Sequence, residues 1–288
     1  MDEHRHRYVH GRSHRESERL HYQASGLADL LHGDTRYLPG TRVLEAACGV
    51  GAQTLILAKN SPAAGFVSLD ISPESLALAE ERIRAEGVKN VTFCQGDVYC
   101  LPFRKESFDH IFVCFLLEHL ENPLLALEKM RGLLKEGGTI TVIEGDHGSA
   151  LFYPDSRDAH RVIDCLVDIQ RQMGGNAMIG RELRHLLLDA GFSKIAVSPR
   201  QVYADSSQPE SIEGVRNIFI AMVERVLRLE ADARAVFLEH HHRGHERVAV
   251  DITQHLRVAA VGHGHHAMRR AEVDAYRQPF FFGMRQRR

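Results

Sequence analysis

The residues best suited to chemistry lie in one short run, Glu45-Ala46-Ala47-Cys48-Gly49-Val50-Gly51. There an apolar, strand-like stretch ends in an acid, and a turn of small residues leads into a helix-compatible stretch over 52–58. Because glycine has no Cβ and tolerates positive φ, such a turn lets a ligand approach the bare backbone. The turn also puts the unpaired N–H groups of a helix N-terminus beside that ligand. The run therefore predicts a ligand site built largely from backbone donors.

Two more acids follow strand-like stretches. Asp70 ends the stretch Val67-Ser68-Leu69, nineteen residues beyond Gly51, and Asp97 follows Gly96 after the stretch 91–95. An acid about 20 residues beyond a glycine turn is placed to bind the ribose hydroxyls of a nucleotide. Ligands of open α/β sheets lie beyond the carboxyl ends of the strands, so we expect both acids and the turn to share one site.

Apolar stretches and turn residues alternate in a way that predicts repeated β-α-β units. We expect strands over 42–46, 66–70, 91–95, 108–115, 139–144 and 195–199, and helices over 51–60, 72–87, 123–134, 157–173, 180–190 and 211–239. Ser72 can cap the second helix and Pro73 suits its first turn, while Gly137 and Gly138 are expected to stop the helix over 123–134. Such units imply a doubly wound, mostly parallel sheet with helices on both faces.

Composition limits the class of protein. The chain has 288 residues, of which 44% are hydrophobic and 26% charged, with a net charge of −2. These values are typical of a globular protein and disfavour nucleic acid as a partner. No apolar stretch is long enough to cross a bilayer and the first residues do not resemble a signal peptide, so we expect a cytoplasmic protein. The five cysteines form no zinc-type pair, and we expect no metal site.

Taken together, the motifs resemble those of class I S-adenosylmethionine-dependent methyltransferases. The resemblance covers about residues 40–150, more loosely to 200, and is closest to the small-molecule branch that includes ubiquinone/menaquinone-type enzymes. It rests on the loop 45–51, Asp70, Gly96-Asp97-Val98 with Leu101-Pro102-Phe103, the stretch from Phe108 to Leu120, and the turn 133–138. It implies a Rossmann-like, seven-stranded sheet, an N-terminal helical lid, C-terminal helical additions and S-adenosyl-L-methionine as cofactor.

The resemblance also implies roles for residues in the loops. Asp70 would bind the ribose diol and Asp97 the adenine amino group, with Ile71 and Val98 on either side of the ring. Ala47 stands where the family has glycine, which a negative φ would tolerate at the cost of weaker or displaced binding. Each acid alone is an ordinary strand-end residue; the three in register favour a cofactor site. The full predicted cofactor set is Glu45, Ala46, Ala47, Gly49, Gly51, Gln53, Thr54, Asp70, Ile71, Gly96, Asp97, Val98 and Phe115.

Methyl transfer to oxygen or carbon often needs a base to remove a proton from the nucleophile. The loops after the fourth and fifth strands supply three catalytic candidates, His119, Asp146 and His147, and Glu144 is a substrate-side candidate. A packed histidine at a helix start explains His119 equally well. Arg181 and Arg200 are candidates for binding an anionic acceptor, although surface arginines are commoner than ligand-binding ones.

The N-terminal segment 1–40 has helical spacing and is predicted to close over the site as a lid. Tyr8, Tyr22 and Gln23 are its substrate- or cofactor-side candidates; the alternative is a solvated helix with Tyr22 packed on the sheet. We expect the cofactor-binding core to cover 41–200, a helical addition 201–239, and a His/Arg-rich tail 240–288, either disordered or an extension peculiar to this chain. The spacing of the tail's histidines completes no recognisable metal-ligand set.

The predicted function is therefore methyl transfer from S-adenosylmethionine to an oxygen, nitrogen or carbon atom of a small molecule, by a monomer or homodimer. Methylation of protein or RNA stays open, and so does non-catalytic binding of the cofactor. An NAD-dependent dehydrogenase is disfavoured, because its loop carries a third glycine where this chain has Thr54.

Overall fold

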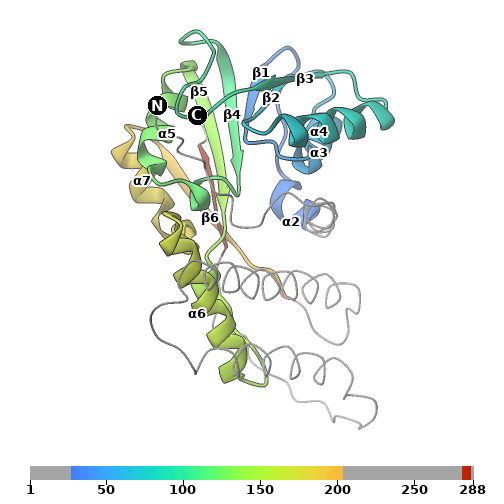
Figure 1. Cartoon of the computed structure of the whole chain (residues 1–288). Coiled ribbons are helices and arrows are strands. Elements are labelled where there is room, and N and C mark those ends of the chain that lie inside the picture. The colour runs from blue at the N-terminus through green and yellow to red at the C-terminus, as the bar shows by residue number, and fades with distance from the viewer. Residues whose placement is uncertain (1–26, 204–280, 287–288) are drawn as a thin grey trace, which may run out of the picture.

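The computed structural model describes residues 27–203 and 281–286, and the remaining residues are drawn as a grey trace (Figure 1). The described strands are β1 (Arg42–Ala46), β2 (Gly65–Asp70), β3 (Val91–Gln95), β4 (Phe108–Cys114), β5 (Leu134–Glu144), β6 (Ile195–Arg200) and β7 (Phe281–Gln286). They form one sheet in the order β3-β2-β1-β4-β5-β7-β6. β1 to β5 are mutually parallel, and β7 runs antiparallel to both β5 and β6. The predicted parallel, Rossmann-like core of five strands is therefore confirmed.

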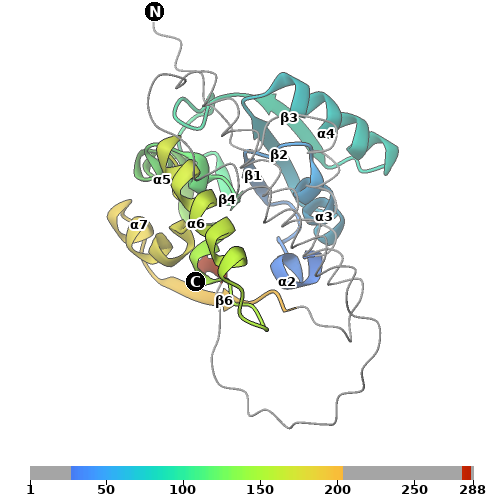
Figure 2. The same ribbon diagram turned by 60° about the horizontal axis from the view of Figure 1, so that its bottom comes forward.

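Helices cover both faces of this sheet (Figures 1 and 2). They are α2 (Ala28–His32), α3 (Ala52–Asn60), α4 (Pro73–Ala85), α5 (Pro123–Arg131), α6 (Arg157–Gln172) and α7 (Leu183–Asp189), with short 3-10 turns η1 (Leu117–His119), η2 (His147–Ser149) and η3 (Ile179–Glu182). Side chains alternate along β1, so that Val43 packs in one core layer with α2 and α3, and Leu44 in the other with α5 and α7. Two buried layers on one sheet are what a doubly wound fold requires.

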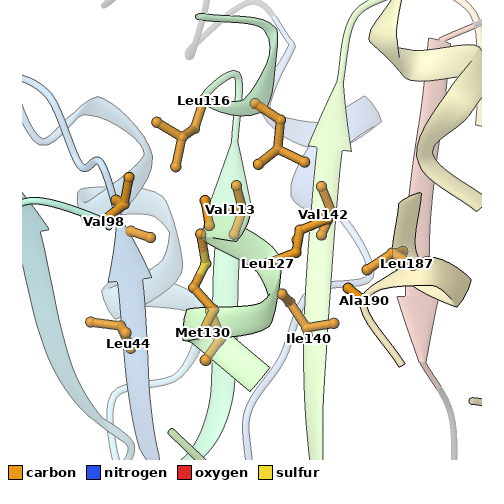
Figure 3. Packing of buried hydrophobic residues seen from close by; sticks show 14 of the residues in the cluster. Leu44, Val98, Val113, Leu116, Leu127, Met130, Ile140, Val142, Leu187 and Ala190 are labelled. Atoms are coloured by element: carbon orange, nitrogen blue, oxygen red, sulfur yellow. The ribbon is translucent and has the colours of Figure 1, made fainter. Parts of the chain in front are cut away.

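The larger layer fixes the middle of the sheet beneath the strand ends. Leu127 and Met130 of α5 lie over β1, β4 and β5, and Val98 and Leu116 close the layer at its upper end (Figure 3). Burying these apolar side chains stabilises the fold by roughly 1.5–3 kcal/mol each. The loops that carry the acids thus begin from rigid strands.

Local sequence signals explain most element boundaries. The hydroxyl of Ser72 accepts the N–H of Ser75 and Pro73 occupies the first position of α4, as predicted. The helix predicted over 123–134 is shorter in the structure, and the prediction that Gly137-Gly138 stops it is wrong. It ends at Arg131, where the N–H of Gly132 caps the last turn, and Leu134 already pairs with Phe108 in the sheet.

Several predictions fall outside the described residues. They are the first 26 residues of the predicted N-terminal lid over 1–40, with Tyr8, Tyr22 and Gln23, the helix over 211–239, and most of the tail. Within the tail, 281–286 forms β7, although no element was predicted there. Its place is decided by pairing with β5 and β6, which a local pattern does not encode.

Candidate functional site

The loop between β1 and α3 contains three residues in the left-handed region. Ala47 has φ 60°, Gly49 φ 53° and Gly51 φ 74°. Glycine adopts this conformation freely, whereas alanine is strained there by about 1–2 kcal/mol. Ala47 therefore does not have the negative φ at which alanine would be tolerated in this loop. Backbone strain held at one point of a loop is common at functional sites.

Gly49 and Asp70 connect the loop to the end of β2. The N–H of Gly49 donates to Oδ2 of Asp70 at 2.8 Å, and the N–H of Ser72 donates to Oδ1 at 2.9 Å. A carboxylate has about four acceptor positions, so two backbone bonds leave room for ribose hydroxyls. A Cβ built on Gly49 meets no atom within 4 Å, so the backbone lies open on that side. This arrangement fits a nucleoside.

Gly51 allows close packing between α3 and α4, and its predicted contact with the cofactor stays a prediction. It caps the N-terminus of α3. A Cβ built on it would lie 2.9 Å from the Cβ and 3.0 Å from the Cα of Ala79 in α4. Only glycine lets these two helices approach so closely at a positive φ.

Glu45 and Thr54 lie behind the loop. Both are buried, and Oε2 of Glu45 accepts hydroxyl hydrogen bonds from Thr54 at 2.7 Å and from Ser68 at 2.6 Å. Burial raises the pKa of Glu45 to about 7, despite these two hydrogen bonds, which favour the charged form. Glu45 and Thr54, both predicted to bind the cofactor, therefore hydrogen-bond to each other behind the loop and hold it in place.

Gln53 is turned away from the loop toward α2. Its side-chain oxygen bonds Nε2 of His32, which is completely buried and packs 5.6 Å from the ring of Phe112, measured between ring centroids. Burial lowers the pKa of His32 to about 4, so the imidazole is neutral near pH 7. The prediction that Gln53 contacts the cofactor has no support in this geometry.

The ends of β2 and β3 carry the residues predicted to bind adenine. Oδ1 of Asp97 accepts the N–H of Tyr99 at 2.8 Å, which fixes the turn after Gly96. Val98 is buried in the larger core layer, whereas Ile71 is 41% exposed. An exposed isoleucine directly after Asp70 offers an apolar surface for a ring, and the predicted roles of Gly96, Asp97, Ile71 and Val98 stay predictions.

The loop after β4 mirrors the loop after β1. Ala46 and Val113 are paired in the sheet. Ala47, one residue beyond Ala46, and Phe115, two residues beyond Val113, both have positive φ. The N–H of Phe115 bonds the carbonyl of Ile143. Two strained, non-glycine residues thus sit at the carboxyl ends of neighbouring strands, where ligands of such sheets bind.

Glu144, predicted as a substrate-side residue, is completely buried at the end of β5. Its Oε1 accepts the N–H groups of Leu116 at 2.9 Å and Leu117 at 2.7 Å, which holds η1 in place. Burial, and next the charge of Glu118, raise the pKa of Glu144 well above its ordinary value. Its Oε2 is buried and finds no hydrogen-bond partner in the part of the chain that the structure describes.

The structure brings His119 and His147 together around a third residue, Glu118. Nε2 of His119 lies 3.4 Å from Oε1 of Glu118, and Nε2 of His147 lies 3.5 Å from Oε2. Glu118 lies within the stretch from Phe108 to Leu120 on which the family resemblance rests, but no role was predicted for it. Its position next to His119, on a loop at the carboxyl edge of the sheet, was the available signal.

Asp146 and the two arginine candidates are engaged in ion pairs. Arg181 binds Asp146 through two parallel hydrogen bonds of 2.8 and 2.7 Å, and Ser149 donates to the same carboxylate. Arg200 binds Asp34 at 2.8 and 3.0 Å. A carboxylate held by a bidentate arginine is a poor base. This geometry favours a structural role for Asp146 and argues against either arginine as a ready anion-binding group.

The C-terminal end of α6 forms a wall against η1. Nε2 of Gln170 and the N–H of Asn176 both donate to the carbonyl of Glu118 at 2.8 Å. A Cβ on Gly175 would overlap that same carbonyl, and one on Gly174 would lie 2.7 Å from Cγ of Glu121. The glycine pair therefore permits the contact that positions Glu118.

Comparison with known families identifies the domain. Residues 38–189, just over half of the chain, match the family described as "Methyltransferase domain". The chain belongs to this methyltransferase family. The matched stretch contains the loop after β1, Asp70, Asp97, η1 and both histidines.

Curated proteins resemble the methyltransferase domain over part of their length. An uncharacterized 37.1 kDa protein in transposon TN4556 of Streptomyces fradiae is 32% identical over 181 residues, which cover 62% of this chain and 51% of that protein. An uncharacterized methyltransferase, C1B3.06c, of Schizosaccharomyces pombe is 31% identical over 52% of this chain and 56% of its own. Demethylmenaquinone methyltransferase of Lactococcus lactis is 32% identical over 40% of this chain and 46% of its own. The chain thus spans about half the length of the curated relatives it matches.

A solved structure shows the same fold. Phosphoethanolamine N-methyltransferase 2 of Haemonchus contortus, in complex with S-adenosyl-L-methionine, superposes with a TM-score of 0.51 at 18% identity and covers 91% of this chain and 51% of its own. At this identity the likeness concerns the fold alone. In the described part of this methyltransferase chain, no helix has both the length and the apolar character needed to cross a membrane.

Proposed function

We propose that this protein transfers a methyl group from S-adenosyl-L-methionine to an oxygen, nitrogen or carbon nucleophile of a small molecule. The observation that carries the proposal is the contact between Gly49 and Asp70 within a methyltransferase-family domain. It joins an open backbone segment to a carboxylate with free acceptor positions, at the sheet edge where such folds bind ligands.

The residues divide into those that would face the cofactor and those that hold them. Ala46, Ala47, Gly49 and Phe115 present backbone at the ends of β1 and β4, and Asp70, Ile71 and Asp97 follow β2 and β3. Glu45 and Thr54 support the loop from behind, Gln53 bonds His32 of α2, and Gly51 permits the packing of α3 against α4. When bound, the cofactor supplies a methyl group already activated by a sulfonium, so the protein's main tasks are alignment and exclusion of water.

The acceptor would lie near η1 and the loop after β5. His119 and His147 are the groups there that can take a proton, and Glu144 shapes the loop between them. A small-molecule acceptor is supported by the name of the Lactococcus lactis relative. The proposal extends to a lid formed by the segment 1–40 with Tyr8, Tyr22 and Gln23, to a complete seven-stranded sheet, and to a monomer or homodimer in the cytoplasm.

Calorimetric titration of the full chain tests the cofactor. The wild type should bind S-adenosylmethionine and S-adenosylhomocysteine, and Asp70→Ala should weaken binding at least about tenfold, because hydrogen bonds to a charged group contribute about 1.5–3 kcal/mol. Asp109→Ala is the matched control, since Asp109 also accepts a backbone N–H, that of Arg42 at 2.8 Å, but lies near the start of β4 at the opposite edge. Equal binding by the Asp70 variant would contradict the assignment.

Turnover tests the reaction. Quinols, phenols, amines and thiols are screened for release of S-adenosylhomocysteine. Release with a small acceptor supports the proposal. The acceptor class is wrong if the protein binds the cofactor but releases S-adenosylhomocysteine only with a protein or RNA acceptor and with no small molecule.

A further inference from the structure

The carboxylate of Glu118 lies between two imidazoles. Its Oε1 is 3.4 Å from Nε2 of His119 and its Oε2 is 3.5 Å from Nε2 of His147. The side chain of Glu118 is only 6% exposed, compared with 11% for His119 and 17% for His147. These separations are long for hydrogen bonds, but catalytic hydrogen bonds often tighten only when the substrate is bound.

The backbone of Glu118 is held from three sides. Its carbonyl accepts hydrogen bonds from the side chain of Gln170 and the N–H of Asn176, and Gly175 lies against it without room for a side chain. On the other side, Glu144 accepts the N–H groups of the two residues before it. A carboxylate on so constrained a turn keeps its direction toward the histidines.

The neighbouring acids do not compete for the histidines. Glu144, on β5, directs its Oε1 to the N–H groups of Leu116 and Leu117, and burial together with the nearby charge of Glu118 raises its pKa. Asp146, on the loop after β5, is bound by Arg181 from η3. The amide of Gln170 on α6 also faces Glu118, with its Nε2 3.5 Å from Oε2. In the described part of the chain, Glu118 is the acid whose carboxylate lies beside both histidine rings.

We propose that Glu118 is a positioning residue that holds His147 as the general base for an acceptor whose nucleophile must lose a proton. This proposal rests on the proposed methyl transfer. A carboxylate beside Nε2 keeps the hydrogen on that nitrogen, which leaves the lone pair on Nδ1 to accept a proton. His147 is the more exposed of the two histidines and is the one that reaches the acceptor; His119 occupies the other oxygen of Glu118.

An imidazole base suits an acceptor hydroxyl group of phenol-like acidity. The acceptor oxygen gives an electron pair to the methyl carbon, the carbon–sulfur bond breaks with its electrons going to sulfur, and the O–H proton passes to Nδ1 of His147. The imidazolium so formed donates Nε2–H to Glu118 and later releases the proton to water. An imidazole can take a proton from a phenol, whose pKa is about 10, more readily than from an aliphatic alcohol.

The first test needs no substrate. In the full chain with 15N-labelled histidine, NMR should show the ring of His147 with its hydrogen on Nε2, and Glu118→Gln should mix the two tautomers. Asp155→Asn is the matched control, because Asp155 pairs with Nε2 of His160 at 2.7 Å on an exposed site, and it should leave the signals of His147 unchanged. A wild-type His147 with its hydrogen on Nδ1 would overturn the proposal.

The second test measures turnover against acceptor acidity. With a phenol that is protonated at the assay pH, Glu118→Gln and His147→Gln should each lower kcat by roughly 100-fold or more while the affinity for S-adenosylmethionine stays within about twofold. With a nitrophenol that is already ionised, the loss should shrink to less than about threefold, because no proton has to be removed. An equal loss with both acceptors, or no loss with either, would overturn the base assignment.

The two levels of inference fail differently. If the wild type does not bind S-adenosylmethionine, both the proposed function and the role of Glu118 are contradicted. A wild type that binds it and methylates only amines or thiols keeps the proposed function and overturns the hydroxyl class. Asp155→Asn, at an exposed side chain that pairs with His160, should retain wild-type turnover in either case.

Discussion

The backbone N–H of Gly49 donates to the carboxylate of Asp70 at 2.8 Å, which ties the loop after β1 to the end of β2. The bond makes the loop and the acid one unit, since a movement of the loop changes the direction of the carboxylate. Neighbouring strands bring these residues together: Ala46 and Leu69 are paired in the sheet. A substitution in the loop should therefore also affect Asp70, and a substitution of Asp70 should also affect the loop.

The glycines of this loop should respond differently to alanine. Gly49→Ala meets no atom, so its cost is the left-handed backbone, about 1–2 kcal/mol, while the added methyl occupies the open side and should weaken cofactor binding. Gly51→Ala adds a clash with Ala79 and should cost about 2–4 kcal/mol in unfolding free energy. Urea unfolding and calorimetry measure both effects. A Gly49 variant less stable than the Gly51 variant would contradict this division of roles.

Ala47→Gly should relax the loop. Removing Cβ at φ 60° relieves about 1–2 kcal/mol of strain, and the greater freedom of glycine in the unfolded chain offsets about 0.4–1 kcal/mol of that gain. We expect the unfolding free energy to rise by up to about 1 kcal/mol, with equal or tighter cofactor binding. Ala52→Gly, at the start of α3, is the control and should lower stability, since glycine is unfavourable in a helix.

The buried acid Glu45 should make stability fall as the pH rises. Its pKa is raised from 4.5 to about 7, so the folded protein retains a proton that the unfolded chain releases. This contribution to the unfolding free energy amounts to up to about 3 kcal/mol. It is complete below pH 4.5 and is lost as the pH rises through about 7. Glu45→Gln cannot ionise and keeps an acceptor for Thr54 and Ser68. In denaturant titrations without cofactor, the unfolding free energy of the variant should rise relative to that of the wild type as the pH increases across this range. A difference that stays constant with pH would refute the assignment.

The contact between α6 and η1 depends on the absence of a side chain at Gly175. Gly175→Ala would push Cβ into the carbonyl of Glu118, so we expect a loss of about 1–3 kcal/mol in unfolding free energy and lower turnover from the displaced carboxylate. Gly65→Ala is the control, because its Cβ meets no atom within 4 Å. If both variants have wild-type stability and turnover, the wall formed by α6 does not position Glu118.

Local patterns were enough to predict the parallel core. The apolar stretches that end in Glu45 or Asp70 became β1 and β2, and Ser72 with Pro73 started α4, because caps and burial periodicity act over a few residues. The start of β5 at Leu134 was missed, since its pairing with Phe108 joins distant parts of the chain.

The sequence by itself determined which strand ends carry acids and that a small-residue loop precedes α3, since both depend on neighbours along the chain. Only the tertiary structure decided what those side chains meet. It gave Ala47 a positive φ, turned Gln53 toward His32, bound Asp146 to Arg181 and set Glu118 between two histidines. The reason is physical: partners and strained dihedrals are selected by packing between elements far apart in sequence, and that packing has no local signature.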